Sequence, residues 1–138
     1  MKTIAEYRLR NRLEDTGRVE QWVREFAEAA NLSPAARNAF DVSLVEWLTN
    51  VISYGYEDAD EHWIAVRFRV GTGMAQVEVE DDGREFNPLG CRPADTSALL
   101  EKRTPGGLGI HLVRQYMEAL DYRRANGRNL FVMTRGAS

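Results

Sequence analysis

The sequence has little cysteine and no long hydrophobic run, and each shortage excludes a class of protein. The single cysteine, Cys91, cannot form an internal disulfide or supply a cysteine cluster for a metal ion. No segment approaches the ~20 apolar residues that a membrane-spanning helix needs. The N-terminal residues lack the apolar region of a signal peptide. We therefore expect a cytoplasmic protein that does not enter a membrane.

Clusters of basic residues are also absent. The 18 lysines and arginines are scattered along a chain of 138 residues with a formal net charge of -3. A nucleic-acid-binding surface concentrates positive charge on one face, so this pattern argues against DNA or RNA as a direct partner. The length suits one compact domain with a hydrophobic core, and we expect residues 1–138 to form a single domain.

The periodicity of the apolar residues predicts a mixture of helices and strands. Ser33 is a good N-cap and Pro34 a good first-turn residue for the longest helix. Asn126 and Gly127 favour a tight hairpin turn. Helical spacing predicts helices over residues 18–30, 34–54 and 106–120, and alternation predicts strands over 4–13, 62–70, 74–80, 121–125 and 129–134. This order of elements predicts an α+β fold.

The first candidate functional feature is a pair of polar residues on the helix of residues 34–54. Glu46 and Asn50 are four residues apart, so their side chains project from the same helix face. A carboxylate beside a carboxamide suits coordination of Mg²⁺ and orientation of a water or hydroxyl. A solvated surface pair is the alternative, although the apolar neighbours Trp47 and Leu48 place the pair at the border of a core.

The second feature is the acidic residue Asp81 at the end of a predicted strand, followed by Gly83. A carboxylate at this position can accept a hydrogen bond from the amino group of a base, and glycine allows close approach of the backbone. An ordinary acidic turn is the alternative interpretation.

The third feature is a glycine-rich entry into the helix of residues 106–120, which contains Gly106, Gly107 and Gly109. Free backbone N–H groups and the helix dipole favour an anion at such a position, for example a triphosphate. A flexible connector before a closely packed helix is the alternative. The segment lacks the Lys-Ser/Thr pair of a Walker A loop, and no parallel βαβ unit surrounds it as in dinucleotide-binding folds.

Taken in order, the three features resemble the N, G1 and G2 boxes of the GHKL ATPase and kinase superfamily, over roughly residues 41–134. The short length and the stretches 48–56 and 107–113 resemble the RsbW/SpoIIAB-type anti-sigma factor serine kinases within it. The resemblance implies a Bergerat-type ATP-binding fold. This is a two-layer α/β sandwich in which helices cover one face of a mixed, mainly antiparallel sheet.

The resemblance also implies a role for each feature. Asn50 would hold the Mg²⁺ that bridges the ATP phosphates, and Glu46 would be the general base for a substrate serine. Asp81 would accept the adenine amino group, with Gly83 allowing the base to approach. Residues 87–105 would form a lid over ATP. The remaining cofactor contacts would come from Thr104, Gly106, Gly107, Leu108 and Gly109.

The partners that the resemblance implies are proteins. The kinase would phosphorylate a serine of a STAS-type anti-anti-sigma protein and would sequester a sigma factor. A homodimer formed through residues 4–26 is also implied. The residues alone leave two alternatives open: a catalytically silent, nucleotide-gated module that regulates a phosphatase or response regulator, and a detached sensor-kinase ATPase domain.

Two positions depart from the family pattern. Glu85 stands where a second glycine is usual in the G1 box, and Tyr54 stands where a histidine is common. The two histidines do not match catalytic positions. We expect His62 to be exposed at a strand start and His111 to be structural.

Overall fold

The computed structural model describes residues 1–90 and 107–138. Thr104, Gly106 and most of the predicted lid over residues 87–105 therefore lie outside the described residues. The strands are β1 (Lys2–Arg10), β2 (Trp63–Gly71), β3 (Met74–Asp81), β4 (Ala119–Ala125) and β5 (Arg128–Gly136). The helices are α1 (Val19–Ala30), α2 (Pro34–Tyr54) and α4 (Gly107–Tyr116), with short 3₁₀ turns η1 (Leu13–Arg18) and η2 (Pro88–Gly90).

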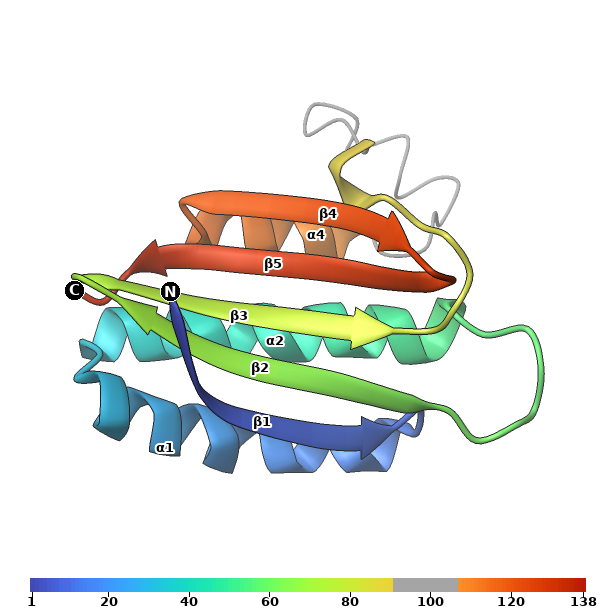
Figure 1. The fold of residues 1–138 in the computed structure, drawn as a ribbon, viewed down its shortest axis with the longest axis horizontal. Coiled ribbons are helices and arrows are strands. Elements are labelled where there is room, and N and C mark those ends of the chain that lie inside the picture. Colours follow the sequence, from blue (N-terminus) through green and yellow to red (C-terminus); the bar gives the residue numbers. More distant parts are fainter. Residues whose placement is uncertain (91–106) are drawn as a thin grey trace.

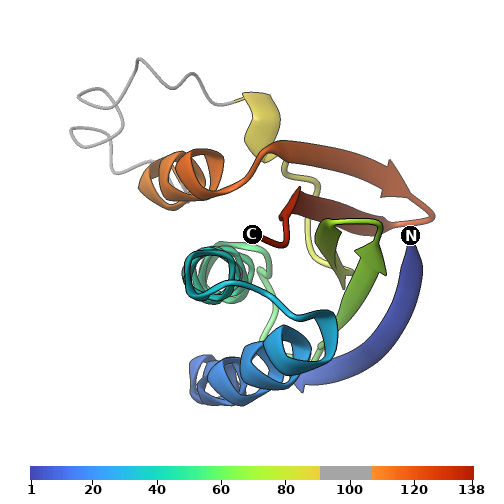
Figure 2. The ribbon, with the colours of Figure 1, turned by 90° about the vertical axis from the view of Figure 1, so that its left-hand side faces the viewer.

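The strands form one sheet in the order β1-β2-β3-β5-β4, and α1, α2 and α4 cover one of its faces (Figures 1 and 2). The predicted α+β fold with helices on one face of the sheet is confirmed. All strand pairings in the described chain are antiparallel, whereas a mixed sheet was expected. None of the helices in this part of the chain is long and apolar enough to cross a membrane.

The core lies between the sheet and the helices. Phe40 of α2 packs edge-on against Phe26 of α1, which in turn contacts Phe68 of β2 at a centroid distance of 4.8 Å. All three rings are buried, so α1 and α2 are held against the sheet by burial of large apolar surfaces.

Helix α2 begins where the sequence predicts. The Ser33 side chain accepts a hydrogen bond from the Ala36 N–H at 3.0 Å, and Pro34 occupies the first turn. The backbone N–H of Ser33 donates to the carbonyl of Ala137 at 2.8 Å. The start of α2 is therefore fixed both by its own cap and by the end of the chain.

Two element boundaries differ from the prediction. The strand expected over residues 4–13 ends at Arg10, because the buried Asp15 carboxylate accepts a hydrogen bond from the Arg10 N–H at 3.0 Å and the chain turns there. The helix expected over residues 106–120 ends at Tyr116, because Leu120 pairs with Met133 in the sheet. Strand pairing thus overrides the helical spacing of these apolar residues.

The hairpin between β4 and β5 has the predicted turn. Asn126 and Gly127 both adopt positive φ, 54° and 74°, as a two-residue type I′ turn requires. The turn brings the start of β5 beside the end of β4, and β5 in turn pairs with β3. This arrangement carries Asn129 to the end of β3.

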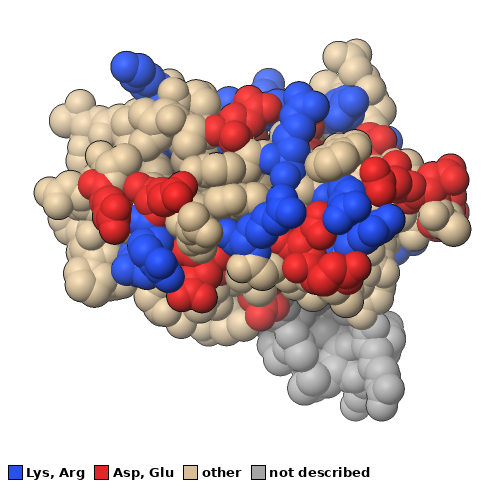
Figure 3. All heavy atoms as spheres, turned by 90° about the horizontal axis from the view of Figure 1, so that it is seen from below, with Lys and Arg blue, Asp and Glu red and all other residues tan. Residues whose placement is uncertain are grey.

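The face of the molecule seen in Figure 3 carries intermixed charges of both signs. Arg67 forms ion pairs with Glu6 of β1 and with Glu78 and Glu80 of β3, and Arg69 also contacts Glu78. The charges of these residues on β1, β2 and β3 therefore largely compensate one another.

Candidate functional site

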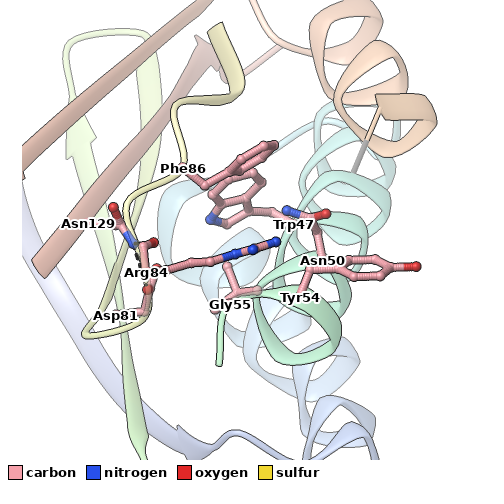
Figure 4. A pocket seen from close by; sticks show the side chains of 9 residues that line it. Trp47, Asn50, Tyr54, Gly55, Asp81, Arg84, Phe86 and Asn129 are labelled. Atoms are coloured by element: carbon pink, nitrogen blue, oxygen red, sulfur yellow. Dashed lines mark hydrogen bonds between the residues drawn. The ribbon is translucent and has the colours of Figure 1, made fainter. Parts of the chain in front are cut away.

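A pocket opens between the C-terminal end of α2 and the end of β3 (Figure 4). The empty space within it, counted together with the solvent at its open side, is about 330 Å³. Its walls come from α2, from the turn after β3 and from the start of β5. The lining residues are Trp47, Asn50, Val51, Tyr54, Gly55, Asp81, Arg84, Phe86 and Asn129.

Asp81 forms the floor of the pocket together with Asn129, its partner in the β3–β5 register. The Asp81 Oδ1 atom accepts hydrogen bonds from Asn129 Nδ2 and from the Gly83 N–H, both at 2.9 Å. No described residue donates to the second oxygen, Oδ2, which leaves it available to a ligand. Burial raises the pKa of the Asp81 carboxyl, and these two hydrogen bonds offset part of that effect.

Asn129 also fixes the turn that follows β3. Its Nδ2 atom donates to the Arg84 carbonyl at 2.8 Å, and its Oδ1 accepts from Tyr122 Oη and from Arg124 Nη1. Arg124 Nη1 donates in addition to the Gly83 carbonyl at 2.7 Å. The donors and acceptors of Asn129 are thus occupied within the protein, and its role in the pocket is to hold Asp81 and the turn.

Gly83 is where the turn approaches helix α2. A Cβ atom at this position would lie 2.6 Å from the Gly55 carbonyl oxygen and 3.0 Å from Asp81 Oδ1. The next residue, Arg84, donates its N–H to the same Gly55 carbonyl at 2.8 Å. The close approach that Gly83 permits in this structure is therefore to the end of α2.

Glu85, which stands at the usual place of a second glycine, is exposed and does not line the pocket. It is not among the described residues with positive φ, so the turn has a backbone shape that a non-glycine residue adopts without strain.

Asn50 projects into the pocket from α2. The residue is 8% exposed, and its Oδ1 atom is buried without a hydrogen-bond partner among the described residues. Glu46 lies one turn earlier, is half-buried and makes no hydrogen bond or ion pair within the described ranges. It is not part of the pocket lining. An unpartnered amide oxygen is a ligand that suits Mg²⁺.

An aromatic wall, which the sequence did not single out, completes the pocket. Trp47 contacts Phe131 at a centroid distance of 4.2 Å and lies nearly parallel to Phe86 at 6.4 Å. Across from it, the Arg84 side chain reaches from the turn toward α2 (Figure 4). Tyr54, at the position where the family often has histidine, lines the pocket and is 46% exposed.

The predicted phosphate-binding residues lie in a different element from the pocket walls. Gly107, Leu108 and Gly109 form the first turn of α4, which packs against α2. None of the described lining residues comes from α4. Within residues 1–90 and 107–138, no group of three or more His, Cys, Asp or Glu side chains could hold a metal ion.

His62 is not exposed as expected. Its side chain is 19% exposed, with Nε2 lying 2.8 Å from Asp58 and Nδ1 3.1 Å from Asp82, and the ring stacks on Tyr56 at 4.4 Å. The hydrogen bonds to Asp58 and then to Asp82 raise the pKa of His62. The residue bridges the loop after α2 to the turn after β3. His111 has its Nε2 buried without a partner among the described residues.

The fold and pocket define an α+β domain with a ligand site between a helix end and a strand end. Residues 9–135 match the family described as the histidine kinase-like ATPase domain. The chain belongs to this family, and membership implies that it binds ATP.

The curated relatives are protein kinases. The serine/threonine-protein kinase BtrW of Bordetella bronchiseptica is 25% identical over 82% of this chain and 80% of its own length. The serine-protein kinase RsbW of Bacillus velezensis is 27% identical over 62% of this chain and 56% of its own length. A GHKL-type kinase is therefore the class of enzyme that the relatives support.

Solved structures share the fold. The RsbU and RsbW domains of Rv1364c from Mycobacterium tuberculosis superpose with a TM-score of 0.64 at 12% identity, over 96% of this chain and 32% of that one. The Acinetobacter baumannii histidine kinase AdeS gives a TM-score of 0.51 at 13% identity, over 96% of this chain and 68% of that one. The chain thus spans about a third of the length of the mycobacterial protein.

Proposed function

We propose that this chain is an anti-sigma factor serine/threonine-protein kinase that binds Mg-ATP and phosphorylates a serine of a STAS-type anti-anti-sigma protein. The observation that carries the proposal is the presence of Asn50 and Asp81 in one pocket, each with a side-chain oxygen that no described residue satisfies. These are two of the oxygens that an adenine nucleotide with its metal ion needs, one for the metal and one for the base.

In this proposal Asp81 Oδ2 accepts a hydrogen bond from the adenine amino group. The first oxygen is already held by Asn129 and Gly83, so the carboxylate has one orientation before the nucleotide arrives. Gly83 keeps the turn after β3 against the end of α2, so this turn has a fixed position beside Asp81.

Asn50 holds Mg²⁺, since its buried amide oxygen lacks another partner. The metal ion would neutralise charge on the ATP phosphates during phosphoryl transfer. Glu46 lies one helical turn from Asn50 and has no protein partner in the described ranges, so its carboxylate is free to accept the proton of a substrate serine.

The start of α4 would hold the ATP phosphates. Gly107, Leu108 and Gly109 there present backbone N–H groups at a helix N-terminus, which favours an anion. Thr104 and Gly106, which lie outside the described residues, would complete this set, and residues 87–105 would cover the nucleotide.

The protein partners follow from the resemblance to the RsbW-type kinases. The chain would sequester a sigma factor, and phosphorylation of the anti-anti-sigma protein would decide which partner it keeps. A homodimer through residues 4–26 is part of this proposal. β1 lies at an edge of the sheet, and Ile4 on it is 38% exposed.

Phosphoryl transfer from γ-labelled Mg-ATP to the STAS-domain proteins encoded nearest this gene tests the proposal. Glu46→Gln should keep ATP binding and lose transfer, and Asn50→Ala should lose Mg²⁺-dependent ATP binding. Two exposed residues on the helices supply matched controls, Glu28→Gln and Asn38→Ala, which should behave as the wild type. ATP binding is measured by calorimetry in the same samples, with and without Mg²⁺.

The outcomes distinguish an active kinase from a catalytically silent module, and they test the role of Glu46. Label on a substrate serine that disappears in Glu46→Gln supports the kinase and identifies its substrate. Binding of ATP without transfer to any candidate favours the catalytically silent, nucleotide-gated module instead. Transfer that persists in Glu46→Gln would remove Glu46 from the role of base.

A further inference from the structure

Of the described residues that line the pocket, two carry a buried polar atom without a hydrogen-bond partner: Oδ1 of Asn50 and Nε1 of Trp47. Asn50 has a role in the proposed function, but Trp47 has none. Trp47 is only 3% exposed. Buried polar groups are nearly always hydrogen-bonded, and a buried indole N–H without an acceptor is costly. The unpartnered N–H of Trp47 therefore indicates that a bound ligand supplies its hydrogen-bond acceptor.

The surroundings of Trp47 hold the indole in place. Phe131 and Phe86 contact its ring system, and α2 fixes its backbone. In Figure 4 the indole nitrogen lies on the side of the ring that faces Arg84 and the Asp81–Asn129 pair. The donor is thus directed into the pocket, toward the residues that form its floor.

The other polar groups on the floor of the pocket limit which hydrogen-bonding groups a ligand can present there. Asn129 and Asp81 Oδ1 are already engaged with one another and with the turn. On the floor side of the pocket, Asp81 Oδ2 is therefore a free acceptor and Trp47 Nε1 a free donor. The complementary ligand presents a donor next to an acceptor. Adenine does so with its amino group and the neighbouring ring nitrogens, whereas guanine places a carbonyl oxygen where adenine has the amino group.

We propose that the Trp47 indole N–H donates a hydrogen bond to a ring nitrogen beside the adenine amino group, either N1 or N7. Trp47 is then a specificity-determining residue that reads the base together with Asp81. This inference rests on the proposed binding of ATP and deepens it, because it assigns a second residue to recognition of the base.

The test distinguishes the effect of losing the indole N–H donor from the effect of changing the shape of the side chain. Trp47 is replaced by β-(3-benzothienyl)alanine, which keeps the two fused rings and has sulfur in place of the N–H group. Trp47→Phe is a second variant made by ordinary mutagenesis. The same benzothienyl replacement at Trp22 is the matched control, because Trp22 is buried on α1 and stacks on Tyr7 away from the pocket. Urea unfolding verifies that each variant folds.

Binding of ATP, 1-deaza-ATP and 7-deaza-ATP is then measured by calorimetry. Loss of one hydrogen bond should weaken ATP binding about 3- to 15-fold in the benzothienyl variant. The wild type should bind one of the two deaza analogues more weakly by a similar factor, and the variant should bind that analogue as well as the wild type does. The Trp22 replacement should leave all three affinities unchanged.

Two results would overturn the inference while leaving the proposed function intact. One is unchanged ATP affinity in the benzothienyl variant. The other is an equal loss of affinity for ATP and both analogues, which would assign Trp47 a packing role alone. Failure of the folded wild-type protein to bind ATP would overturn the proposed function, and this inference with it.

Discussion

Asp81 and Asn129 face each other across the β3–β5 pairing, and the amide of Asn129 donates to the carboxylate of Asp81 at 2.9 Å. The two residues are 48 positions apart in sequence and come together only because β5 lies beside β3. The same amide group holds the backbone of the next turn, so one side chain supports both the floor and a wall of the pocket.

Replacement of Asn129 should therefore weaken both stability and binding. Asn129→Ala removes the donors to Asp81 and to the Arg84 carbonyl, and we expect a loss of about 1–3 kcal/mol in the free energy of unfolding. ATP affinity should fall as well, because the Asp81 carboxylate loses its fixed orientation. Urea denaturation and calorimetry measure the two effects. The exposed Asn38→Ala on α2 should change stability by no more than about 0.5 kcal/mol. An Asn129→Ala variant as stable as the wild type would contradict the supporting role.

The ionised Asp81 carboxylate should lower the stability of the folded protein, although it contributes to ATP binding. Burial raises its pKa in the folded protein, so the folded state disfavours the ionised form. The free energy of unfolding therefore falls as the pH rises from the unfolded pKa through the higher folded pKa. Asp81→Asn removes this dependence and should be at least as stable as the wild type at neutral pH. Its preference for ATP over GTP should drop by about 10- to 100-fold.

Urea unfolding across the acid to neutral range, with ATP and GTP binding at neutral pH, tests this expectation. Asp121→Asn, a change at an exposed position on β4, is the control. Equal pH dependence in the Asp81 variant and the wild type would show that the buried carboxyl does not titrate as inferred.

Gly83 should tolerate no side chain. An alanine Cβ would lie 2.6 Å from the backbone oxygen of Gly55, so the turn after β3 and the end of α2 would have to separate. We expect Gly83→Ala to lower the free energy of unfolding by about 1–3 kcal/mol, as other overpacked positions do. Gly17→Ala is the matched control, because nothing lies within 4 Å of the added carbon. It should be neutral or slightly stabilising, since it reduces the freedom of the unfolded chain. Equal thermal midpoints for the two variants would rule out the close approach.

The His62 bridge should stabilise the protein most at low pH. Hydrogen bonds to Asp58 and Asp82 raise the pKa of His62 above its unfolded value of about 6.5. The resulting stability is fully present below the unfolded pKa and is lost as the pH rises through the folded pKa. His62→Gln should therefore differ from the wild type more at about pH 6 than at about pH 9. Urea unfolding at both values measures this, and Asp82→Asn should reduce the same difference. Parallel stability curves would mean that the bridge does not depend on the charge of His62.

Local features of the fold were predictable from the sequence where neighbouring residues decide the structure. Ser33 and Pro34 mark the start of α2, and Asn126 and Gly127 set the turn between β4 and β5, because cap and turn geometry depend on a few adjacent residues. The end of α4 was wrong because Leu120 satisfies helical spacing and strand pairing equally well, and the sheet decides between them.

The sequence identified only some of the residues that form the candidate site. Asn50 and Asp81 lie in short motifs that the resemblance points to. The apolar neighbours of Trp47 predict a core residue, although its indole nitrogen faces the pocket. Asn129 reads as the start of a strand, and its contact with Asp81 depends on the non-sequential order of β3 and β5. Such contacts follow from the topology of the sheet, and the residues next to them in sequence do not predict them.

Gly55 caps the C-terminal end of helix α2, and its carbonyl accepts a hydrogen bond from the N–H of Arg84, so this part of the pocket is held in place before any ligand enters. A preformed frame loses little conformational entropy on binding, and more of the contact energy then remains as affinity. Adenosine without phosphates should for this reason already bind with a favourable free energy. The phosphates and the metal ion would then add to a complex that the base has already placed.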